Sequence, residues 1–225
     1  MTDPRLLILT AGAFGAAVAE GLAARYAGST VLDVNQGTHP SLWPDSDLIV
    51  LATGQGREVL ADMVDASAHS WNRPWFPVQA GPLDLRCGPV VVPGRTACHR
   101  CYTRRRAQHT APTADRTRDG GATAPPVSGH APHHVAIAVG LADQAVCEAL
   151  AVPGEPGAAE GIGATVRIFG IVEGATSSSA VVAVDRCARC RPARTPESRL
   201  ARFEAIAAEL AALPALPALP ALPGQ

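Results

Sequence analysis

The stretch Arg5-Leu-Leu-Ile-Leu-Thr-Ala-Gly-Ala-Phe-Gly15 decides the fold that we expect for this sequence. The apolar run over 5–10 predicts a strand, the glycines predict a turn, and the alanine-rich segment up to Tyr26 predicts a helix. Further strands are predicted over 29–34 and 47–52, and a second helix over 57–70. Strands that alternate with helices at this spacing are typical of an α/β protein with a parallel sheet and helices on its faces.

The second half of the chain has a different pattern. Three short β runs, over 75–80, 83–87 and 90–92, are separated by Gly-Pro pairs, which predict the turns of an antiparallel meander. A polar loop over 107–132, a helix over 133–150, a second meander with strands over 166–169 and 180–184, and a helix over 196–213 follow. We expect one domain over 1–213 and, because proline recurs at every third position, a disordered tail over 214–225.

The basic residues are all arginine: the chain of 225 residues contains 19 of them and no lysine. Schiff-base chemistry and a phosphate-binding P-loop lysine are therefore excluded. A formal net charge of −1 creates no field that would attract nucleic acid or an anionic membrane. Because the sequence has neither a signal peptide nor an apolar run long enough to cross a bilayer, we expect a cytoplasmic protein.

Two Cys-x-x-Cys pairs carry the strongest functional prediction. They are Cys98 with Cys101 and Cys187 with Cys190, and each follows a predicted strand. A two-residue gap on a tight turn places two thiolates about 3.5–4 Å apart, the edge of a tetrahedral zinc site, so two pairs can close a structural four-cysteine site. A redox dithiol and four inert thiols are the alternatives, although a redox pair usually occurs singly and opens a helix.

Arginines crowd the two cysteine pairs. They can offset the negative charge of zinc bound by four thiolates, or they can form a basic face for an acidic peptide or partner. Nucleic acid is the weaker alternative, because Tyr102 is the only aromatic residue among them. The arginines in question are Arg95, Arg100, Arg104, Arg105, Arg106, Arg186, Arg189, Arg191 and Arg194.

Two further groups have less definite roles. Cys147 lies beside the apolar stripe of its predicted helix and Cys87 ends a β run, so we expect both to be buried. His130, His133 and His134 cluster where that helix begins. They form either a solvated helix N-terminus or a group with a metal-binding or proton-transfer role.

The glycines of the first turn, Gly12 and Gly15, stand where a nucleotide pyrophosphate binds at the N-terminus of a helix. Asp33 comes about 20 residues later, where an acid that binds the ribose would be. Thr10, however, occupies the position of the first glycine of a Gly-x-Gly-x-x-Gly motif. The alternative is that the glycines only pack the helix on the strand, and that Asp33 belongs to a loop.

The order of these elements resembles the ThiF/MoeB superfamily of adenylating proteins, whose zinc sits between two such cysteine pairs. More narrowly, Gly88-Pro-Val-Val-Val-Pro-Gly-Arg-Thr-Ala-Cys-His-Arg-Cys101 is similar to the ThiF-like partner proteins of YcaO cyclodehydratases. The resemblance covers 5–192. It implies a Rossmann-like sheet followed by antiparallel meanders, structural Zn²⁺ on the four cysteines, and a place in the biosynthesis of azole- or azoline-bearing ribosomal peptides such as bacteriocins.

Four parts of the adenylating site implied by this resemblance are absent. Thr10 replaces a glycine, and the sequence contains no lysine. Residues 34–39, which follow the second predicted strand, include no arginine, and residues 52–55, which follow the third, include no acidic residue. We therefore expect that Gly12, Gly15 and Asp33 are the vestige of a nucleotide site, that this chain adenylates nothing, and that the partner uses the ATP. The loop over 107–132 also lacks a cysteine for a thioester relay.

The function that we expect is a catalytically silent scaffold, which binds a YcaO-type protein and helps to present or activate modification of a precursor peptide. Four residues precede the first predicted strand, so we expect the leader peptide to be recognised by another chain or by strand addition to this chain's own sheets. The resemblance makes a homodimer possible. The alternatives are a divergent ATP-dependent adenylating enzyme and an unrelated Rossmann-type oxidoreductase with structural zinc.

Overall fold

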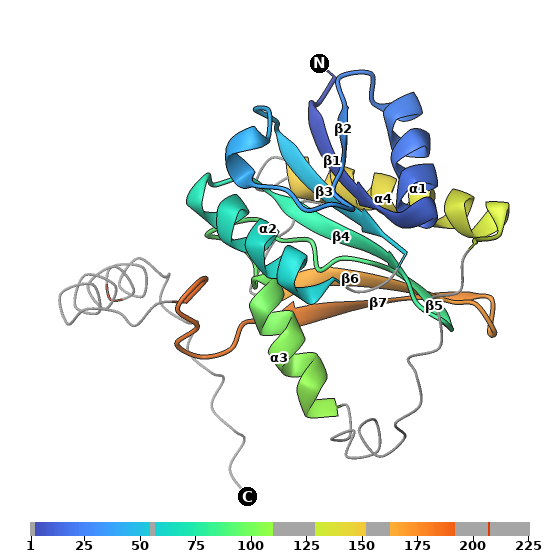
Figure 1. Cartoon of the computed structure of the whole chain (residues 1–225). Coiled ribbons are helices and arrows are strands. Elements are labelled where there is room, and N and C mark those ends of the chain that lie inside the picture. The colour runs from blue at the N-terminus through green and yellow to red at the C-terminus, as the bar shows by residue number, and fades with distance from the viewer. Residues whose placement is uncertain (1–2, 55–56, 110–128, 152–162, 192–206, 208–225) are drawn as a thin grey trace, which may run out of the picture. The chain divides into compact units, whose positions relative to one another are not determined.

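The computed structural model describes residues 3–54, 57–109, 129–151, 163–191 and 207. Its centre is a seven-stranded mixed sheet with the order β2-β1-β3-β4-β5-β6-β7 (Figure 1). The strands are β1 (Leu6–Ala11), β2 (Thr30–Asp33), β3 (Leu48–Thr53), β4 (Trp75–Ala80), β5 (Asp84–Cys87), β6 (Gly163–Gly170) and β7 (Ala175–Val182). The helices are α1 (Gly12–Arg25), α2 (Glu58–Ser70), α3 (His99–His109), α4 (Pro132–Leu150) and the 3-10 turn η1 (Pro40–Leu42). The α/β fold with a parallel N-terminal half is confirmed.

The parallel half of the sheet forms because β1 and β3 are apolar on both faces, and every residue of the two strands is buried. Alternate residues of β1 serve opposite layers. Leu6 and Ile8 pack into the core with α1 and α4, whereas Leu7 and Leu9 pack into the core with α2. Figure 1 shows the same layers, with α1 and α4 on one side of the sheet and α2 on the other.

The strand over Trp75–Ala80 is parallel to β3 on one side and antiparallel to β5 on the other, so it ends the parallel half and opens the antiparallel half, as predicted. The crossover through α2 returns the chain to the same end of the sheet, and a strand that follows such a crossover is parallel to the one before it. The first antiparallel pair of the sheet is β4 with β5.

The predicted strand over 90–92 is reduced to a single bridge. Val91 pairs with Trp75 across that bridge, and both residues are buried. Gly88 has a φ of +105°, and a Cβ at this position would overlap the carbonyl oxygen of Thr165, so the chain turns here against β6. The segment therefore crosses the end of the sheet and carries the chain toward α3.

Several predicted boundaries move or lie outside the described residues. Residues 107–109 of the predicted loop belong to α3, Pro132 begins α4, and 110–128 lie outside the described part. The chain divides into two compact units, Met1–Arg191 and Pro192–Gln225, and Ala207 is the only described residue of the second unit. The domain boundary after 213, the helix over 196–213 and the tail over 214–225 therefore stay predictions. No helix in the described part is long and apolar enough to cross a bilayer.

Candidate metal centre

The first cysteine pair sits where α3 begins. Thr96, which is fully buried, holds the segment that leads to α3 in place. Its Oγ1 accepts from the Val92 backbone N–H at 2.8 Å and donates to the carbonyl of Val90 at 3.2 Å. Cys98 directly precedes α3, and Cys101 lies in its first turn with its N–H bonded to the Cys98 carbonyl at 3.0 Å. The pair opens a helix, so the expected tight turn directly after a strand is wrong for this pair.

The second pair lies on a turn after β7, as expected. The Cys187 N–H bonds to the Val184 carbonyl at 3.2 Å, and the Arg191 N–H returns to the Cys187 carbonyl at 2.8 Å. Arg186, with a φ of 51°, takes the left-handed conformation that tightens this turn. The Val184 N–H points back to the first pair and bonds to Cys101 Sγ at 3.3 Å.

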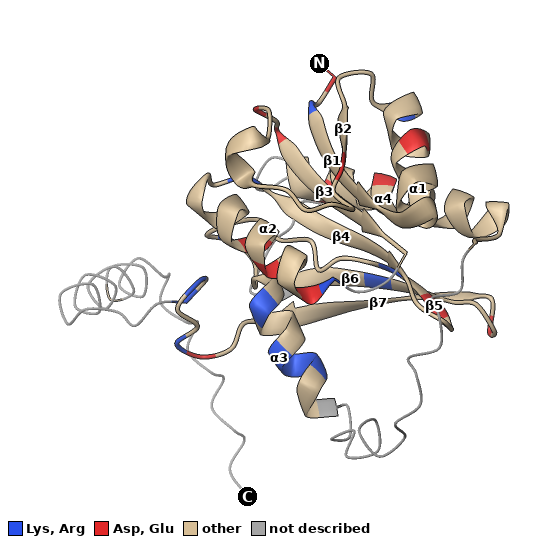
Figure 2. Cartoon of the chain, in the orientation of Figure 1, with Lys and Arg blue, Asp and Glu red and all other residues tan. Residues whose placement is uncertain are grey.

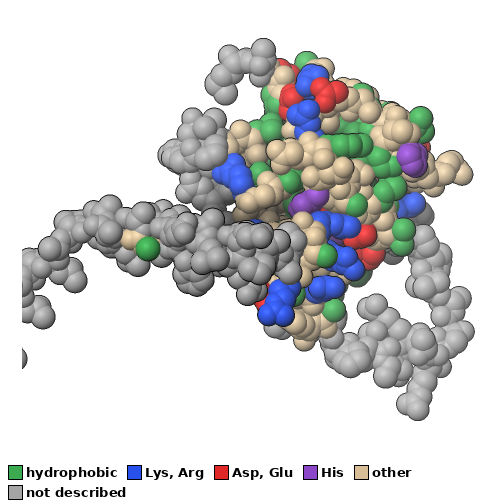
Figure 3. All heavy atoms as spheres, turned by 90° about the vertical axis from the view of Figure 1, so that its left-hand side faces the viewer, with side chains coloured by type: hydrophobic (Ala, Val, Ile, Leu, Met, Phe, Trp, Pro, Cys, Tyr) green, Lys and Arg blue, Asp and Glu red, His purple; other side chains and the backbone are tan. Residues whose placement is uncertain are grey.

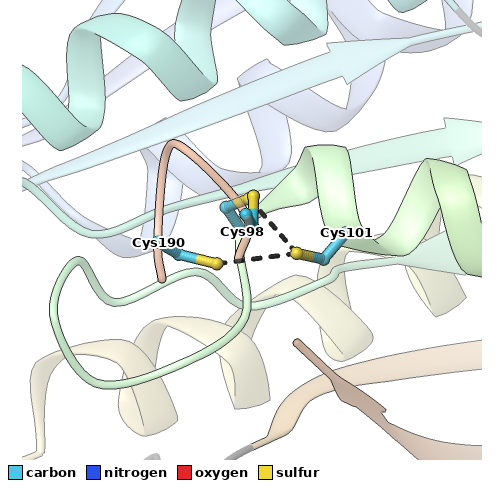
Figure 4. A group of neighbouring side chains, drawn as sticks. Cys98, Cys101 and Cys190 are labelled. Atoms are coloured by element: carbon cyan, nitrogen blue, oxygen red, sulfur yellow. Dashed lines mark hydrogen bonds between the residues drawn. The ribbon is translucent and has the colours of Figure 1, made fainter. Parts of the chain in front are cut away.

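The four sulfurs converge, although one pair lies at the start of α3 and the other follows β7. The Sγ–Sγ distances are 3.7 Å from Cys98 to Cys101, 3.7 Å from Cys98 to Cys187 and 3.5 Å from Cys101 to Cys190. All four lie within 4.8 Å of one another and all four residues are buried. Figure 4 shows how Cys98, Cys101 and Cys190 point toward a common centre. Four thiolates around one centre are arranged to hold a metal ion.

The electrostatics of the cluster favour a cation at its centre. Hydrogen bonding from Cys98 lowers the pKa of the Cys190 thiol to about 5. The same contact with Cys190, together with burial, raises the pKa of Cys98, and burial raises the pKa of Cys101 to about 11. Without a cation the buried thiols must share protons, whereas a bound metal ion stabilises all four thiolates.

A buried carboxylate, Asp65 of α2, ties the cluster to the sheet. Its side chain is 0% exposed, and its Oδ1 accepts from Trp75 Nε1 at 2.9 Å and from the His99 N–H at 3.2 Å. Its other oxygen accepts from Arg189 Nη1, in the second cysteine turn, at 2.7 Å. One carboxylate therefore joins β4, the start of α3 and the second cysteine turn.

The arginines beside the second cysteine pair have individual partners. Arg189 also bonds Asp62 at 2.7 Å, and this contact lowers the pKa of the Asp62 carboxyl. Arg186 pairs with Asp185, and Arg191 Nη1 donates to the Cys190 carbonyl at 3.0 Å. Figure 2 shows further arginines along α3. Arg189 thus compensates two carboxylates beside the cluster, a role that the sequence reading did not foresee.

Asp65 was missed, but the sequence contains a clue to it. The buried residues of α2 are Ala61, Val64, Asp65 and Ala68, which form one face at helical spacing. An aspartate within an otherwise apolar stripe needs a buried partner, because an unpaired charge there would be very costly. That partner is Arg189, whose position depends on the pairing of distant strands.

The glycine turn joins β1 to α1. A Cβ at Gly15 would overlap the Ala52 carbonyl oxygen, so this glycine allows α1 to pack directly on β3. Gly12 has a φ of +76°, and its N–H donates to Asn35 Oδ1 at 3.1 Å. Asp33 ends β2, as expected, and its carboxylate accepts from the Asn35 N–H at 2.8 Å. The assignment of these residues to a vestigial nucleotide site stays a prediction.

The histidines and the two remaining cysteines are not brought into the cluster. His133 and His134 lie in the first turn of α4, and His130 meets Phe14 edge-on. Within the described part, the four cysteines form the one group of at least three potential ligands with metal-binding geometry. The prediction for Cys87 is confirmed, since it is buried.

Cys147 is exposed, so the prediction that it packs in the core is wrong. Its neighbour Val146 occupies the buried stripe of α4, and one further residue rotates the side chain by about 100° toward solvent. Sequence spacing placed Cys147 at the border of the stripe, where one position decides between burial and exposure.

Comparisons with known proteins find the same fold in solved structures of a heterocyclase and of MccB. No protein-family description and no curated protein matches the sequence. The heterocyclase TruD shares the fold, with a TM-score of 0.54 and 18% identity over 85% of this chain and 28% of that one. Escherichia coli MccB does so with a TM-score of 0.56 and 14% identity over 86% of this chain and 67% of its own. MccB solved with ATP gives a TM-score of 0.52 at 13% identity, over 84% of this chain and 67% of that one.

The share of each neighbour that is covered differs. This chain spans about a quarter of the length of TruD and two thirds of that of MccB. At these identities the likeness shows the fold.

Proposed function

We propose that this chain is a ThiF/MoeB-like scaffold that does not adenylate its substrate. It would bind a YcaO-type cyclodehydratase and help to present or activate modification of a ribosomally made precursor peptide in azoline or azole biosynthesis. The observation that carries the proposal is the four-cysteine cluster at the end of the antiparallel half, in a fold shared with a heterocyclase and with MccB. Its sequence context, Gly88–Cys101, supplies the narrower likeness to YcaO partners.

The metal at the cluster would be Zn²⁺, held by Cys98, Cys101, Cys187 and Cys190. Zinc prefers four thiolates in a tetrahedron, and Zn–S bonds of about 2.3 Å require sulfurs about 3.8 Å apart. The three Sγ–Sγ distances of 3.5–3.7 Å fit that requirement. Four protein ligands leave no open position for water or substrate, so the zinc would stabilise the fold and take no part in chemistry.

The glycine turn supports the absence of adenylation. MccB has been solved with ATP, so a nucleotide can be held on this fold. Here the Gly12 N–H, which would face a phosphate at the helix N-terminus, donates to Asn35, and the sequence has no lysine. An amide that must exchange a partner within the chain for a phosphate gains less from binding.

One observation favours the alternative of a divergent ATP-dependent enzyme. Arg57, at the start of α2, reaches Asn35 Oδ1 at 3.5 Å and therefore lies beside the glycine turn. A guanidinium can pair with phosphate oxygens in two contacts, so it could replace a lysine in charge. It supplies no carboxylate for Mg²⁺, which adenylation also requires.

Reconstitution tests the proposed function. A YcaO-type protein and a precursor peptide from the same source are incubated with ATP, with and without this chain, and ring formation is followed by mass spectrometry as loss of water. We expect this chain to co-purify with the YcaO-type protein and to raise the rate of ring formation. The Cys147→Ser variant should act as the wild type does. No co-purification and no change in rate at a stoichiometric amount of folded chain would overturn the scaffold.

A further inference from the structure

Strand β7 ends the sheet and has an open outer edge. It pairs with β6 alone, and seven of its eight residues are exposed. Within the described part of the chain, the backbone of 175–182 forms no hydrogen bond outside the β6–β7 ladder. Among the described residues, none pairs with its outward N–H and C=O groups, which a further strand could therefore use.

This edge lacks the features that usually protect an edge strand. Its sequence, Ala-Thr-Ser-Ser-Ser-Ala-Val-Val, contains no charge and no proline over eight residues, a length of about 26 Å. The strand at the other edge, β2, has only four residues and is therefore a poor template. A long, unprotected and polar edge is suited to accept an extended peptide by strand addition.

A basic helix lies against one end of this edge. Arg105 of α3 donates to the Ala183 carbonyl at 3.5 Å, directly after β7, and Cys101 of α3 accepts from Val184. The side chains of Arg100, Arg104 and Arg105 are exposed, and none of them forms an ion pair with a residue of the described part. Figures 2 and 3 show arginines on α3 and gathered on the lower part of the surface.

We propose that the free edge of β7 binds an extended acidic peptide as an eighth strand, and that arginines of α3 pair with its carboxylates. Backbone hydrogen bonds to β7 would supply affinity at any sequence, whereas Arg104 and Arg105 would select for acidic residues near the C-terminal end of β7. The proposal rests on the proposed function only for the source of the peptide, which is the ribosomally made precursor.

A second copy of this chain is the less suitable occupant. β7 carries no charged residue, so pairing of β7 with its own copy about a two-fold axis would offer no acidic partner on the added strand to the arginines of α3. An acidic segment instead meets positive charge and an unpaired edge together.

Fluorescence anisotropy with the full chain tests this surface. The probe is a labelled decapeptide in which Glu alternates with Val or Thr. The controls are the same peptide with Lys in place of Glu, and two Glu peptides N-methylated at alternate residues in the two registers. We expect the Glu peptide to bind, the Lys peptide to bind at least tenfold more weakly, and one of the N-methylated peptides to lose binding.

Four variants locate the site. The double variant Arg104→Glu with Arg105→Glu should weaken binding at least tenfold, and Arg57→Glu, the matched reversal elsewhere on the surface, should leave it unchanged. Of Ser178→Pro and Ser179→Pro, the one whose N–H points outward should lose binding and keep the wild-type Tm, because neighbouring residues face opposite sides of a strand's ladder.

Four results would overturn the proposal: no binding of the Glu peptide, equal binding of the Lys peptide, loss of binding in neither N-methylated register, or dimers that occlude the edge in sedimentation. None of these measurements needs a YcaO-type protein. Failure here therefore leaves the scaffold proposal standing, and failure of reconstitution leaves this surface standing.

Discussion

The cysteine cluster after β7 and the glycine turn after β1 are both places where this fold could hold a small charged group, yet they are built to very different degrees. At the cluster, four buried sulfurs converge and a fully buried carboxylate ties both cysteine turns to the sheet. At the glycine turn, the N–H of Gly12 is bonded to an exposed asparagine, and Gly15 serves close packing.

The contrast separates a cluster that several buried bonds hold in place from a turn that backbone conformation and close packing hold in place. Deep burial and several charge-assisted bonds make substitutions costly at the cluster. At the glycine turn, the constraints come from backbone conformation and helix–strand contact. Stability should therefore depend far more on the cluster than on the glycine turn.

Loss of one cysteine of the cluster should have the largest effect. Cys187→Ser should abolish metal binding and destabilise the protein by several kcal/mol, a fall in Tm of about 10 °C or more, because metal binding and folding are coupled. Elemental analysis and calorimetry measure both quantities. Cys147→Ser is the matched control, since that residue is exposed, and it should retain metal and Tm. Full metal content in Cys187→Ser would show that the cluster is no metal site.

Removal of the buried carboxylate should come next. Asp65→Ala leaves Trp75 Nε1 and the His99 N–H without their partner and Arg189 with Asp62 alone, and loss of one member of a buried charge pair costs about 3–5 kcal/mol. Asp62→Ala removes the exposed partner of the same arginine and should cost less than about 1 kcal/mol. Chemical denaturation of the two variants measures the difference. Equal losses would mean that burial of Asp65 does not matter to the cluster.

Alanine substitutions at Gly15 and Gly12 should destabilise the protein less than loss of Asp65 does, and for different reasons. Gly15→Ala introduces a Cβ that overlaps the Ala52 carbonyl and should cost about 1–3 kcal/mol, as overpacking does. Gly12→Ala meets open space but keeps a φ of +76°, so it should cost about 1–2 kcal/mol. Thermal melts of the pair test this order. A larger loss of stability in Gly12→Ala than in Gly15→Ala would indicate that something other than backbone conformation constrains the turn.

Cys87 and Cys147, the two thiols outside the cluster, should differ in reactivity. Burial raises the pKa of Cys87 from 9.0 to about 12, so its thiolate fraction at pH 8 should be about a thousandfold below that of a free thiol. Cys147 is exposed and should react readily with iodoacetamide. Peptide mapping by mass spectrometry distinguishes the two. Comparable labelling of both in the folded protein would contradict the burial of Cys87.

The raised pKa of Cys87 makes the free energy of unfolding depend on pH in the alkaline range. Since the folded pKa of Cys87 lies above the unfolded value, its contribution to stability is complete at neutral pH. It is lost as the pH rises from about 9 toward 12, where the unfolded thiol ionises first. Cys87→Ala should remove this part of the alkaline dependence.

Local patterns in the sequence predicted most of the elements. The apolar run over 5–10, the glycine turn and the helix that follows appear as β1 and α1, and the helix over 133–150 appears as α4 with Pro132 added. Periodicity and turn residues act over a few positions, so they can be recognised in one sequence. Convergence of the four cysteines was also foreseeable, because two Cys-x-x-Cys pairs in one chain suggest a common centre.

Other features depend on tertiary pairing, which local patterns do not contain. The direction of β4 follows from the α2 crossover, and the single bridge at Val91 follows from its position across the sheet end. Asp65 and Arg189 meet although 124 residues separate them. Cys147 was misplaced because one residue on a helix changes the direction of a side chain by about 100°.

Nucleotide binding and activation are the properties on which the scaffold account depends. The wild-type chain is titrated with ATP and Mg²⁺ in a calorimeter, with MccB as the positive control for ATP binding, and is then assayed for ATP–pyrophosphate exchange with candidate precursor peptides. The account predicts no binding heat in the micromolar range and no exchange above background, from a chain that is folded and contains its metal. Micromolar ATP affinity together with exchange above background would contradict it and establish the adenylating alternative.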